Sequence, residues 1–264
     1  MEEKMTTKTG IGEIPWSVGD IAKGIGVVIA LTLLITFGLG LGTVLLIGSD
    51  ALYEAGLLSV ADFLNFLAAE GQLQQWLLIA LAAMAIGEGG MLFAAWLFSV
   101  SKYRCGWRAL GFRSFNLKRA LIPVAMVLIA GVSINLLYEW VLTSFGGDTA
   151  SGVDLTYTLL QEFTQTGLGL AGMTLIAVVV APIAEETFLR GFIFSGIGRR
   201  FGYGWGAVIS ALIFSVAHLQ PGALLPIFLL GLLLAWVYVR TGSIWPCIFI
   251  HLAYNSIGIL FMVI

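Results

Sequence analysis

Residues 184–190 read Ala-Glu-Glu-Thr-Phe-Leu-Arg and place three charged side chains inside an otherwise apolar run over 168–197. Each charge at membrane depth costs about 2.5–3.5 kcal/mol on insertion scales, so it is kept only where a partner offsets the cost. Glu186 and Arg190 are four residues apart, which predicts an ion pair along one helix face. Glu185 is turned about 100° from Glu186. We therefore expect Glu185 to face a different neighbour and to be available for chemistry or for another helix.

The composition is that of a membrane protein. Of the 264 residues, 59% are hydrophobic and 11% are charged, whereas a soluble domain has about 25% charged residues. Several apolar runs approach the roughly 20 residues that cross a bilayer as a helix. The sequence predicts an all-α, polytopic membrane protein, multi-pass in the cell (plasma) membrane. Lipids are its expected surroundings, and no nucleic-acid partner is expected.

Seven transmembrane helices are predicted within one domain, 1–264, because no repeat or linker divides the chain. The expected spans are 24–48, 76–99, 120–145, 168–198, 205–219, 223–240 and 244–264. The fifth is short, and a tilted or re-entrant segment is its alternative. An interfacial helix is expected over 57–67 and an external loop over 146–166.

The basic residues predict the orientation of these spans. All of them lie at or near one side: Lys4, Lys8, Lys23, Lys102, Arg104, Arg108, Arg113, Lys118, Arg119, Arg190, Arg199, Arg200 and Arg240. The opposite side carries only acidic residues: Asp50, Glu54, Asp62, Glu70, Asp148, Asp154 and Glu162. By the positive-inside rule the N-terminus is cytoplasmic, and seven spans place the C-terminus outside.

Further polar residues lie within the spans. The two histidines, His218 and His251, are both in apolar surroundings, and Asn255 shares a helix face with His251. A lone buried histidine is usually a satisfied core residue, but intramembrane ionisable residues that gather are candidates for a functional site. At 1.5 Å rise per residue, Glu185, His218, His251 and Asn255 all fall about 10–21 Å below the cytoplasmic face.

Two other residues of these spans enter the hypothesis. Pro182 is expected to kink the fourth span one turn before Glu185, which would open space there. Glu88 sits mid-span among Gly87, Gly89 and Gly90. It is expected either to bond to a neighbouring helix, the favoured interpretation, or to line the cavity.

Two kinds of hydrolytic chemistry fit these groups. A carboxylate with an imidazole can hold and deprotonate a water molecule, while an imidazole N–H and a carboxamide can donate to an oxyanion. Equally, one glutamate and two histidines can bind zinc and leave a position for water. The spacing does not choose between them. The His-Glu-x-x-His and Gly-x-Ser-x-Gly motifs of other hydrolases are absent from the sequence.

Three motifs carry a family resemblance. Glu-Glu-x-x-x-Arg at 185–190, Phe-x-x-x-His at 214–218 and His-x-x-x-Asn at 251–255 resemble the CPBP (CAAX protease and bacteriocin-processing, Abi) family of intramembrane proteases. This family includes the type II CAAX prenyl endopeptidases, and the resemblance covers about 170–264.

The resemblance implies roles for the motif residues. Glu185 and His218 would activate the attacking water, and His251 and Asn255 would stabilise the oxyanion. Glu186 and Arg190 would support the site. If the enzyme uses zinc, Glu185, His218 and His251 would be its ligands, but a metal-free, glutamate-type mechanism is equally implied.

The leading hypothesis is an intramembrane endopeptidase that cuts a membrane-anchored substrate, such as a prenylated CAAX-type or otherwise lipidated peptide or protein, near the cytoplasmic face. The alternative is a non-proteolytic membrane scaffold or bacteriocin-immunity protein on the same fold. A transporter with a proton relay is the third hypothesis. It is disfavoured because the external ends of the last three spans offer almost no polar path.

Overall fold

The computed structural model describes residues 14–47, 66–69, 71–145, 162–163 and 167–263, and all the regular structure in these ranges is helical. The predicted all-α, polytopic fold is confirmed. The main helices are α1 (Val18–Ile47), α4 (Leu73–Ala95), α5 (Leu117–Ser144), α10 (Tyr203–Ala217), α11 (Leu224–Thr241) and α12 (Trp245–Val263). One long helix between α5 and α10 consists of α7 (Gly167–Thr174), η3 (Leu175–Val180), α8 (Ala181–Glu186), η4 (Thr187–Phe194) and α9 (Ser195–Phe201). Shorter pieces are η1 (Trp96–Ser101), η2 (Trp107–Leu110) and η5 (Pro221–Ala223).

Each predicted span coincides with a helix. Five are long and apolar enough to cross a membrane, namely Val18–Val44, Leu73–Ser101, Leu117–Ser144, Gly167–Phe201 and Pro221–Thr241. Tyr203–Ala217 and Trp245–Phe261 are shorter apolar helices. The 15 residues of α10 reach only about 22 Å, less than the roughly 30 Å of a bilayer core. The expected interfacial helix over 57–67 and the loop over 146–166 lie almost entirely outside the described residues.

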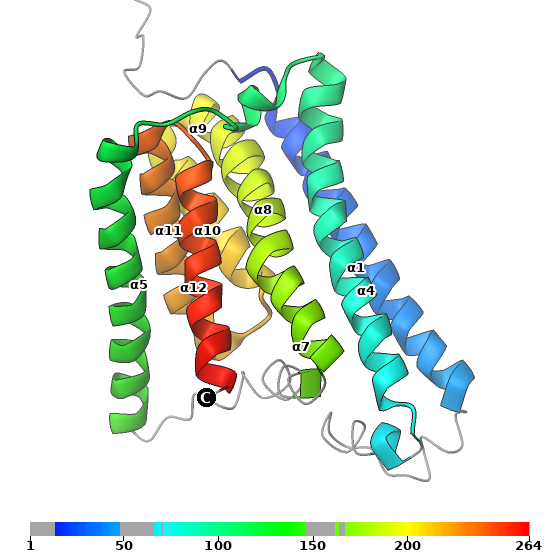
Figure 1. The fold of residues 1–264 in the computed structure, drawn as a ribbon. Coiled ribbons are helices and arrows are strands. Elements are labelled where there is room, and N and C mark those ends of the chain that lie inside the picture. Colours follow the sequence, from blue (N-terminus) through cyan, green and yellow to red (C-terminus); the bar gives the residue numbers. More distant parts are fainter. Residues whose placement is uncertain (1–13, 48–65, 70, 146–161, 164–166, 264) are drawn as a thin grey trace, which may run out of the picture.

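The helices run up and down between two ends of a bundle (Figure 1). The starts of α1, α5, α10 and α12 lie at one end, together with the last residues of α9 and α11, and the C-terminus lies at the other end. The first end therefore gathers the basic α4–α5 connection with Arg199, Arg200 and Arg240. The helix directions agree with the one-sided distribution of basic residues. That the basic side faces the cytoplasm stays a prediction.

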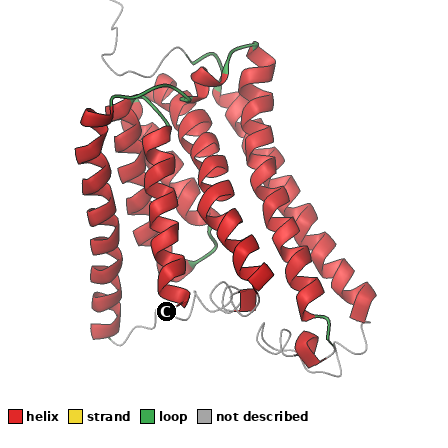
Figure 2. Ribbon diagram, in the orientation of Figure 1, coloured by secondary structure: helices red, strands yellow, loops and turns green. Residues whose placement is uncertain are grey.

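The long helix that runs from α7 to α9 lies in the middle of the bundle. In Figure 2 this helix stands between the α1–α4 pair and the group of α5, α10, α11 and α12. Every residue of η4 is buried. Its Phe192 and Phe194 belong to the same hydrophobic core cluster as Leu234 and Tyr238 of α11. Charged motif residues are thus carried by the helix that has protein neighbours on most sides.

The basic end of α1 is fastened to the rest of the bundle. The indole Nε1 of Trp16 donates to the carbonyl oxygen of Phe192 at 2.9 Å. Asp20 is 1% exposed; its carboxylate accepts from the hydroxyl of Tyr103 at 2.6 Å and pairs with Lys102. The hydrogen bond to Asp20 raises the pKa of Lys102. These contacts tie the first span to the connection that follows η1.

Two π-helical segments, η3 and η4, interrupt the long helix on either side of α8. A π segment shifts the hydrogen bonds to wider spacing, so some carbonyl groups lose their usual donors. Side chains supply the replacements: the hydroxyl of Ser195 donates to the carbonyl oxygen of Arg190 at 2.9 Å, and Trp16 to that of Phe192. The sequence predicted a disturbance at Pro182, but not these π segments.

Candidate active site

The predicted ion pair of Glu186 and Arg190 is confirmed. Nη1 of Arg190 lies 2.9 Å from Oε1 of Glu186, and both side chains are 0% exposed. Nη2 of Arg190 donates to the carbonyl oxygen of Gly231 in α11 at 3.1 Å. The guanidinium also lies 4.8 Å from the centre of the Phe214 ring, which adds a cation–π contact. The pair therefore joins the long helix to α10 and α11.

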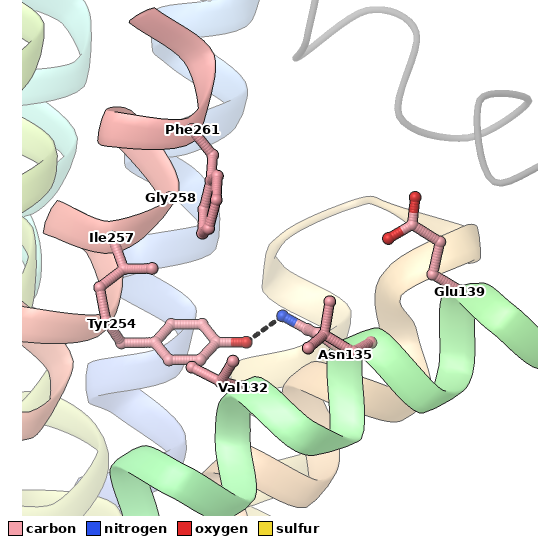
Figure 3. Close-up of a pocket in the computed structure, with 8 residues that line it drawn as sticks. Val132, Asn135, Glu139, Tyr254, Ile257, Gly258 and Phe261 are labelled. Atoms are coloured by element: carbon pink, nitrogen blue, oxygen red, sulfur yellow. Dashed lines mark hydrogen bonds between the residues drawn. The ribbon is translucent and has the colours of Figure 1, made fainter. Parts of the chain in front are cut away.

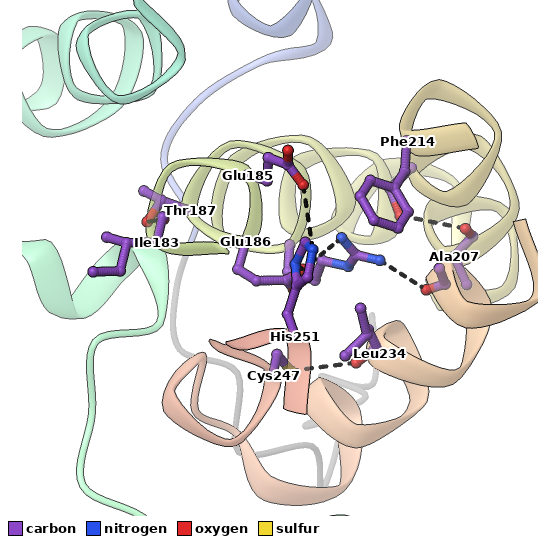
Figure 4. A network of polar contacts seen from close by, with 12 residues as sticks. Ile183, Glu185, Glu186, Thr187, Ala207, Phe214, Leu234, Cys247 and His251 are labelled. Atoms are coloured by element: carbon purple, nitrogen blue, oxygen red, sulfur yellow. Dashed lines mark hydrogen bonds and ion pairs between the residues drawn. The ribbon is translucent and has the colours of Figure 1, made fainter. Parts of the chain in front are cut away.

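His251 lies between the two adjacent carboxylates (Figure 4). Its Nδ1 is 3.0 Å from Oε1 of Glu186, and its Nε2 is 3.6 Å from Oε2 of Glu185. Because a carboxylate paired with arginine can only accept, Nδ1 carries the proton of that hydrogen bond. As expected, Glu186 has its ion-pair partner in its own helix, and Glu185 faces a residue of another helix. The sequence did not predict that the same histidine also contacts Glu186. Since the two ring nitrogens lie on different edges of the imidazole, one histidine contacts both carboxylates.

The two carboxylates nevertheless differ in their hydrogen bonds and in their exposure. Oε1 of Glu186 accepts from both Arg190 and His251, and the side chain is fully buried. The side chain of Glu185 is 15% exposed, and its contact with Nε2 of His251 is longer than a hydrogen bond. Its Oε2 is buried and has no hydrogen-bond partner. Oε2 of Glu186 also lacks a partner, but Glu185 alone is partly exposed and takes part in no described hydrogen bond. Glu185 is therefore the carboxylate better placed to bind and deprotonate another molecule.

His218 ends α10 and is held by its own helix. Its Nδ1 lies 2.7 Å from the carbonyl oxygen of Phe214. Since a carbonyl only accepts, Nδ1 carries the proton, and Nε2 of the neutral ring keeps a lone pair. His218 and His251 both pack edge-on against Phe214, at 4.8 and 5.5 Å between ring centres. Among the described contacts no hydrogen bond joins His218 to Glu185, so the predicted pair would have to act through a water molecule between them.

Asn255 reaches across to the long helix. Its Nδ2 donates to the carbonyl oxygen of Ala177, in η3, at 2.7 Å. A carboxamide carries two N–H donors. One is used by this bond, and the described contacts include no partner for the second.

Glu88 joins this group from α4, which packs against α8. Its Oε2 is buried without a hydrogen-bond partner, and the carboxylate is near enough to Glu185 for their charges to interact. The sequence singled out Glu88 as a mid-span acid but favoured bonding to a neighbouring helix. Its placement beside Glu185 could not be read from the sequence, because no periodicity links α4 to α8.

The side chains of this cluster that were predicted to hold a metal ion are not gathered around one point. Within the described residues, no group of three or more His, Cys, Asp and Glu side chains is gathered closely enough to hold a metal ion. The predicted zinc ligands Glu185, His218 and His251 do not form such a group as arranged here. The Nδ1 atoms of both histidines are occupied by Glu186 and Phe214, but a zinc ion would bind at Nε2, so the zinc site stays a prediction.

A separate cavity of about 400 Å³ lies between α5 and α12 (Figure 3). Nδ2 of Asn135 donates to the hydroxyl of Tyr254 at its wall, and Glu139 lies on its lining. Tyr254 faces α5, whereas its neighbour Asn255 contacts η3. The cavity is therefore on another side of α12 from the carboxylate–imidazole cluster.

The fold and the cluster define a class: a multi-pass membrane protein with an acid–imidazole centre among its helices. Residues 167–257 match the family model described as Type II CAAX prenyl endopeptidase Rce1-like. Over this segment, which holds every motif residue of the sequence analysis, the resemblance to the type II CAAX prenyl endopeptidases is confirmed.

Two curated proteins are similar to the chain. It is 33% identical over 84 residues to “Putative membrane peptidase YdiL” of Bacillus subtilis (strain 168), which covers 32% of this chain and 34% of that protein. It is 33% identical over 95 residues to “Uncharacterized 24.3 kDa protein” of Escherichia coli, covering 34% and 44%. The matches thus span less than half of these relatives. No solved structure matches the chain. Together the findings support a membrane protease.

Proposed function

We propose that the protein is an intramembrane endopeptidase of the CAAX type, which hydrolyses a peptide bond near the cytoplasmic face. The observation that carries the proposal is the state of Glu185. It is a partly exposed carboxylate whose buried Oε2 has no hydrogen-bond partner, beside a histidine fixed by the Glu186–Arg190 pair. This cluster lies within the segment that matches the family.

The geometry supports a division of labour in the attack. Glu185 takes a proton from a water molecule that also donates to Nε2 of His218, and the resulting hydroxide attacks the carbonyl carbon. The proton held by Glu185 then passes to the leaving amine as the carbon–nitrogen bond breaks. A new carboxylate and a new amine are the products. Glu186 is less suited to this role. Its Oε2 also has no hydrogen-bond partner, but its side chain is fully buried and its charge is balanced by Arg190, which shares its Oε1 with His251.

The oxyanion requires donors that are in place before the reaction. Asn255 supplies the second N–H of its carboxamide, since the first is bound to Ala177. His251 donates from Nε2 only when both ring nitrogens carry protons. In that form the imidazolium lies between the carboxylates of Glu185 and Glu186.

The surroundings of the site indicate the kind of substrate. The cluster is set among apolar helices, five of which are long enough to cross a membrane, so its peptide has to reach it from within or beside the bilayer. We propose that a lipid or transmembrane anchor delivers the substrate, as a prenylated CAAX-type tail would, and that the protein works in the cell membrane. A scaffold or immunity protein on the same fold is the competing proposal.

The test uses purified protein in lipid nanodiscs. Peptides with a prenyl anchor, an acyl anchor, a transmembrane anchor or no anchor are incubated with it, and products are identified by mass spectrometry. The proposal predicts cleavage of at least one anchored class and little of the unanchored peptide. Folded protein that cuts none of the anchored peptides would overturn it in favour of the scaffold.

Metal dependence is tested in the same preparation. Metal content is measured for the wild type and for His251→Gln. If His251 is an oxyanion donor, the substitution lowers activity and leaves bound metal unchanged. If it is a zinc ligand, metal and activity fall together, and added zinc restores part of both.

A further inference from the structure

The carbonyl group of Ala177 has lost both of its helical donors. The N–H of Ala181, which would bond to it in an α-helix, bonds instead to the carbonyl oxygen of Ile176. That bond has the five-residue spacing of η3. At the same spacing, the donor to the carbonyl of Ala177 would be the N–H of residue 182. Residue 182 is proline, which has no N–H. The local sequence therefore leaves one carbonyl inside the bundle without a backbone partner.

Asn255 supplies the missing donor. Its Nδ2 lies 2.7 Å from the carbonyl oxygen of Ala177, on a helix 78 residues away in sequence. A buried carbonyl without a donor is unfavourable, particularly where no water competes. The need for a donor fixes one N–H of the carboxamide, and thereby the direction of the other. Asn255 follows His251 by about one helical turn, so both residues lie on the same face of α12. The bond to Ala177 therefore also holds that face toward the long helix.

We propose that Pro182 is a positioning residue for Asn255. By withholding an N–H from Ala177, it reserves that carbonyl for the carboxamide and aims the second N–H of Asn255 at the oxyanion. The catalytic meaning of this inference rests on the proposed function. Its structural content, that Pro182 determines the hydrogen bonding of Asn255, does not.

The substitution Pro182→Ala restores an N–H in register with the 181-to-176 bond. We expect it to bond to Ala177 and to release Asn255. Loss of an oxyanion donor typically costs about 10²–10³-fold in kcat, so kcat should fall at least about tenfold, by less than for Asn255→Ala, with KM unchanged. The melting temperature should stay the same or rise, because proline is unfavourable inside a helix. Pro123→Ala removes the proline inside α5 and is the matched control, with wild-type kcat.

A double-mutant cycle separates positioning from a general effect on the helix. If Pro182 acts through Asn255, Pro182→Ala has no further effect on kcat in the Asn255→Ala background. An equal loss in both backgrounds would contradict the proposal, as would wild-type kcat in Pro182→Ala.

A second measurement does not need activity. The chain contains four asparagines, Asn65, Asn116, Asn135 and Asn255, so selective ¹⁵N labelling gives a simple side-chain amide spectrum, and Asn255→Ala assigns the signal of interest. That signal should shift in Pro182→Ala and not in Pro123→Ala. A shift in protein that cleaves nothing would overturn the proposed function alone. No shift would overturn the role of Pro182 alone, whatever the enzyme does.

Discussion

The first helix, α1, and the long helix over Gly167–Phe201 are almost equally apolar, but the protein buries them to different extents. Their mean hydropathies are 2.4 and 2.1, but 6% of the first and 33% of the second is buried. Between Lys23 and Ile47 the first helix carries no charge, whereas the second carries Glu185, Glu186 and Arg190. A charge in a spanning helix needs partners from protein. Burial by neighbouring helices, more than hydropathy, therefore decides where chemistry can reside.

The largest expected effect concerns the free carboxylate of the buried helix. Glu185→Gln keeps the size of the side chain and removes the base, so turnover of an anchored peptide should fall about 10²–10⁴-fold. The melting temperature should stay near that of the wild type, because Glu185 makes no hydrogen bond at Oε2. The measurement is kcat together with a thermal melt in the same detergent. Loss of folding along with activity would mean that the two glutamates share one role.

The next effect concerns the buried pair. Glu186→Gln leaves the Arg190 guanidinium, and Arg190→Met leaves the Glu186 carboxylate, as an uncompensated charge in a fully buried position. Breaking such a pair costs about 3–5 kcal/mol. The double change should be milder than either single change, as measured by unfolding in detergent. Single variants as stable as the wild type would show that the ion pair contributes nothing.

A smaller effect is expected where the peripheral helices meet the buried one. Glu88→Gln replaces a carboxyl group that interacts with Glu185 by an amide that cannot ionise, and it leaves the base in place. Turnover should fall by about tenfold or less, below the range for losing the base itself. Glu139→Gln, on the cavity side of α5, is the control. Identical kinetics of the two variants would place Glu88 outside the site.

The smallest effect is expected on the lipid-facing side of α1. Phe37 is 71% exposed, so Phe37→Ala removes no protein packing. Stability should change by no more than about 0.5 kcal/mol, and turnover should be unchanged. A large loss of stability would mean that α1 packs against protein in the membrane, for example another copy of the chain.

The sequence predicts much of this fold because membrane depth imposes simple rules. The lengths of the apolar runs identified the helices, and a four-residue spacing identified the Glu186–Arg190 pair. Motif residues 185, 218, 251 and 255 were singled out because polar groups are rare in such spans. Their roles in the reaction, the zinc ligands and the single-domain assignment stay predictions.

What the sequence could not predict depends on contacts between distant elements. Spacing along one helix says nothing of a second helix, so the insertion of His251 between Glu185 and Glu186 was missed. The bond from Asn255 to Ala177 joins α12 to a π segment, η3, which the sequence did not predict. Glu88 was recognised as unusual, but its neighbour Glu185 lies on another helix, α8, and the two meet only in the folded bundle.

The central claim, that Glu185 activates water for peptide hydrolysis, is tested most directly by cleavage in H₂¹⁸O. An anchored peptide is incubated with the wild type and with Glu185→Gln, and the products are weighed by mass spectrometry. The account predicts one ¹⁸O atom in the new carboxyl terminus formed by the wild type, and almost no product from folded Glu185→Gln. Product formed by Glu185→Gln at the wild-type rate would contradict it.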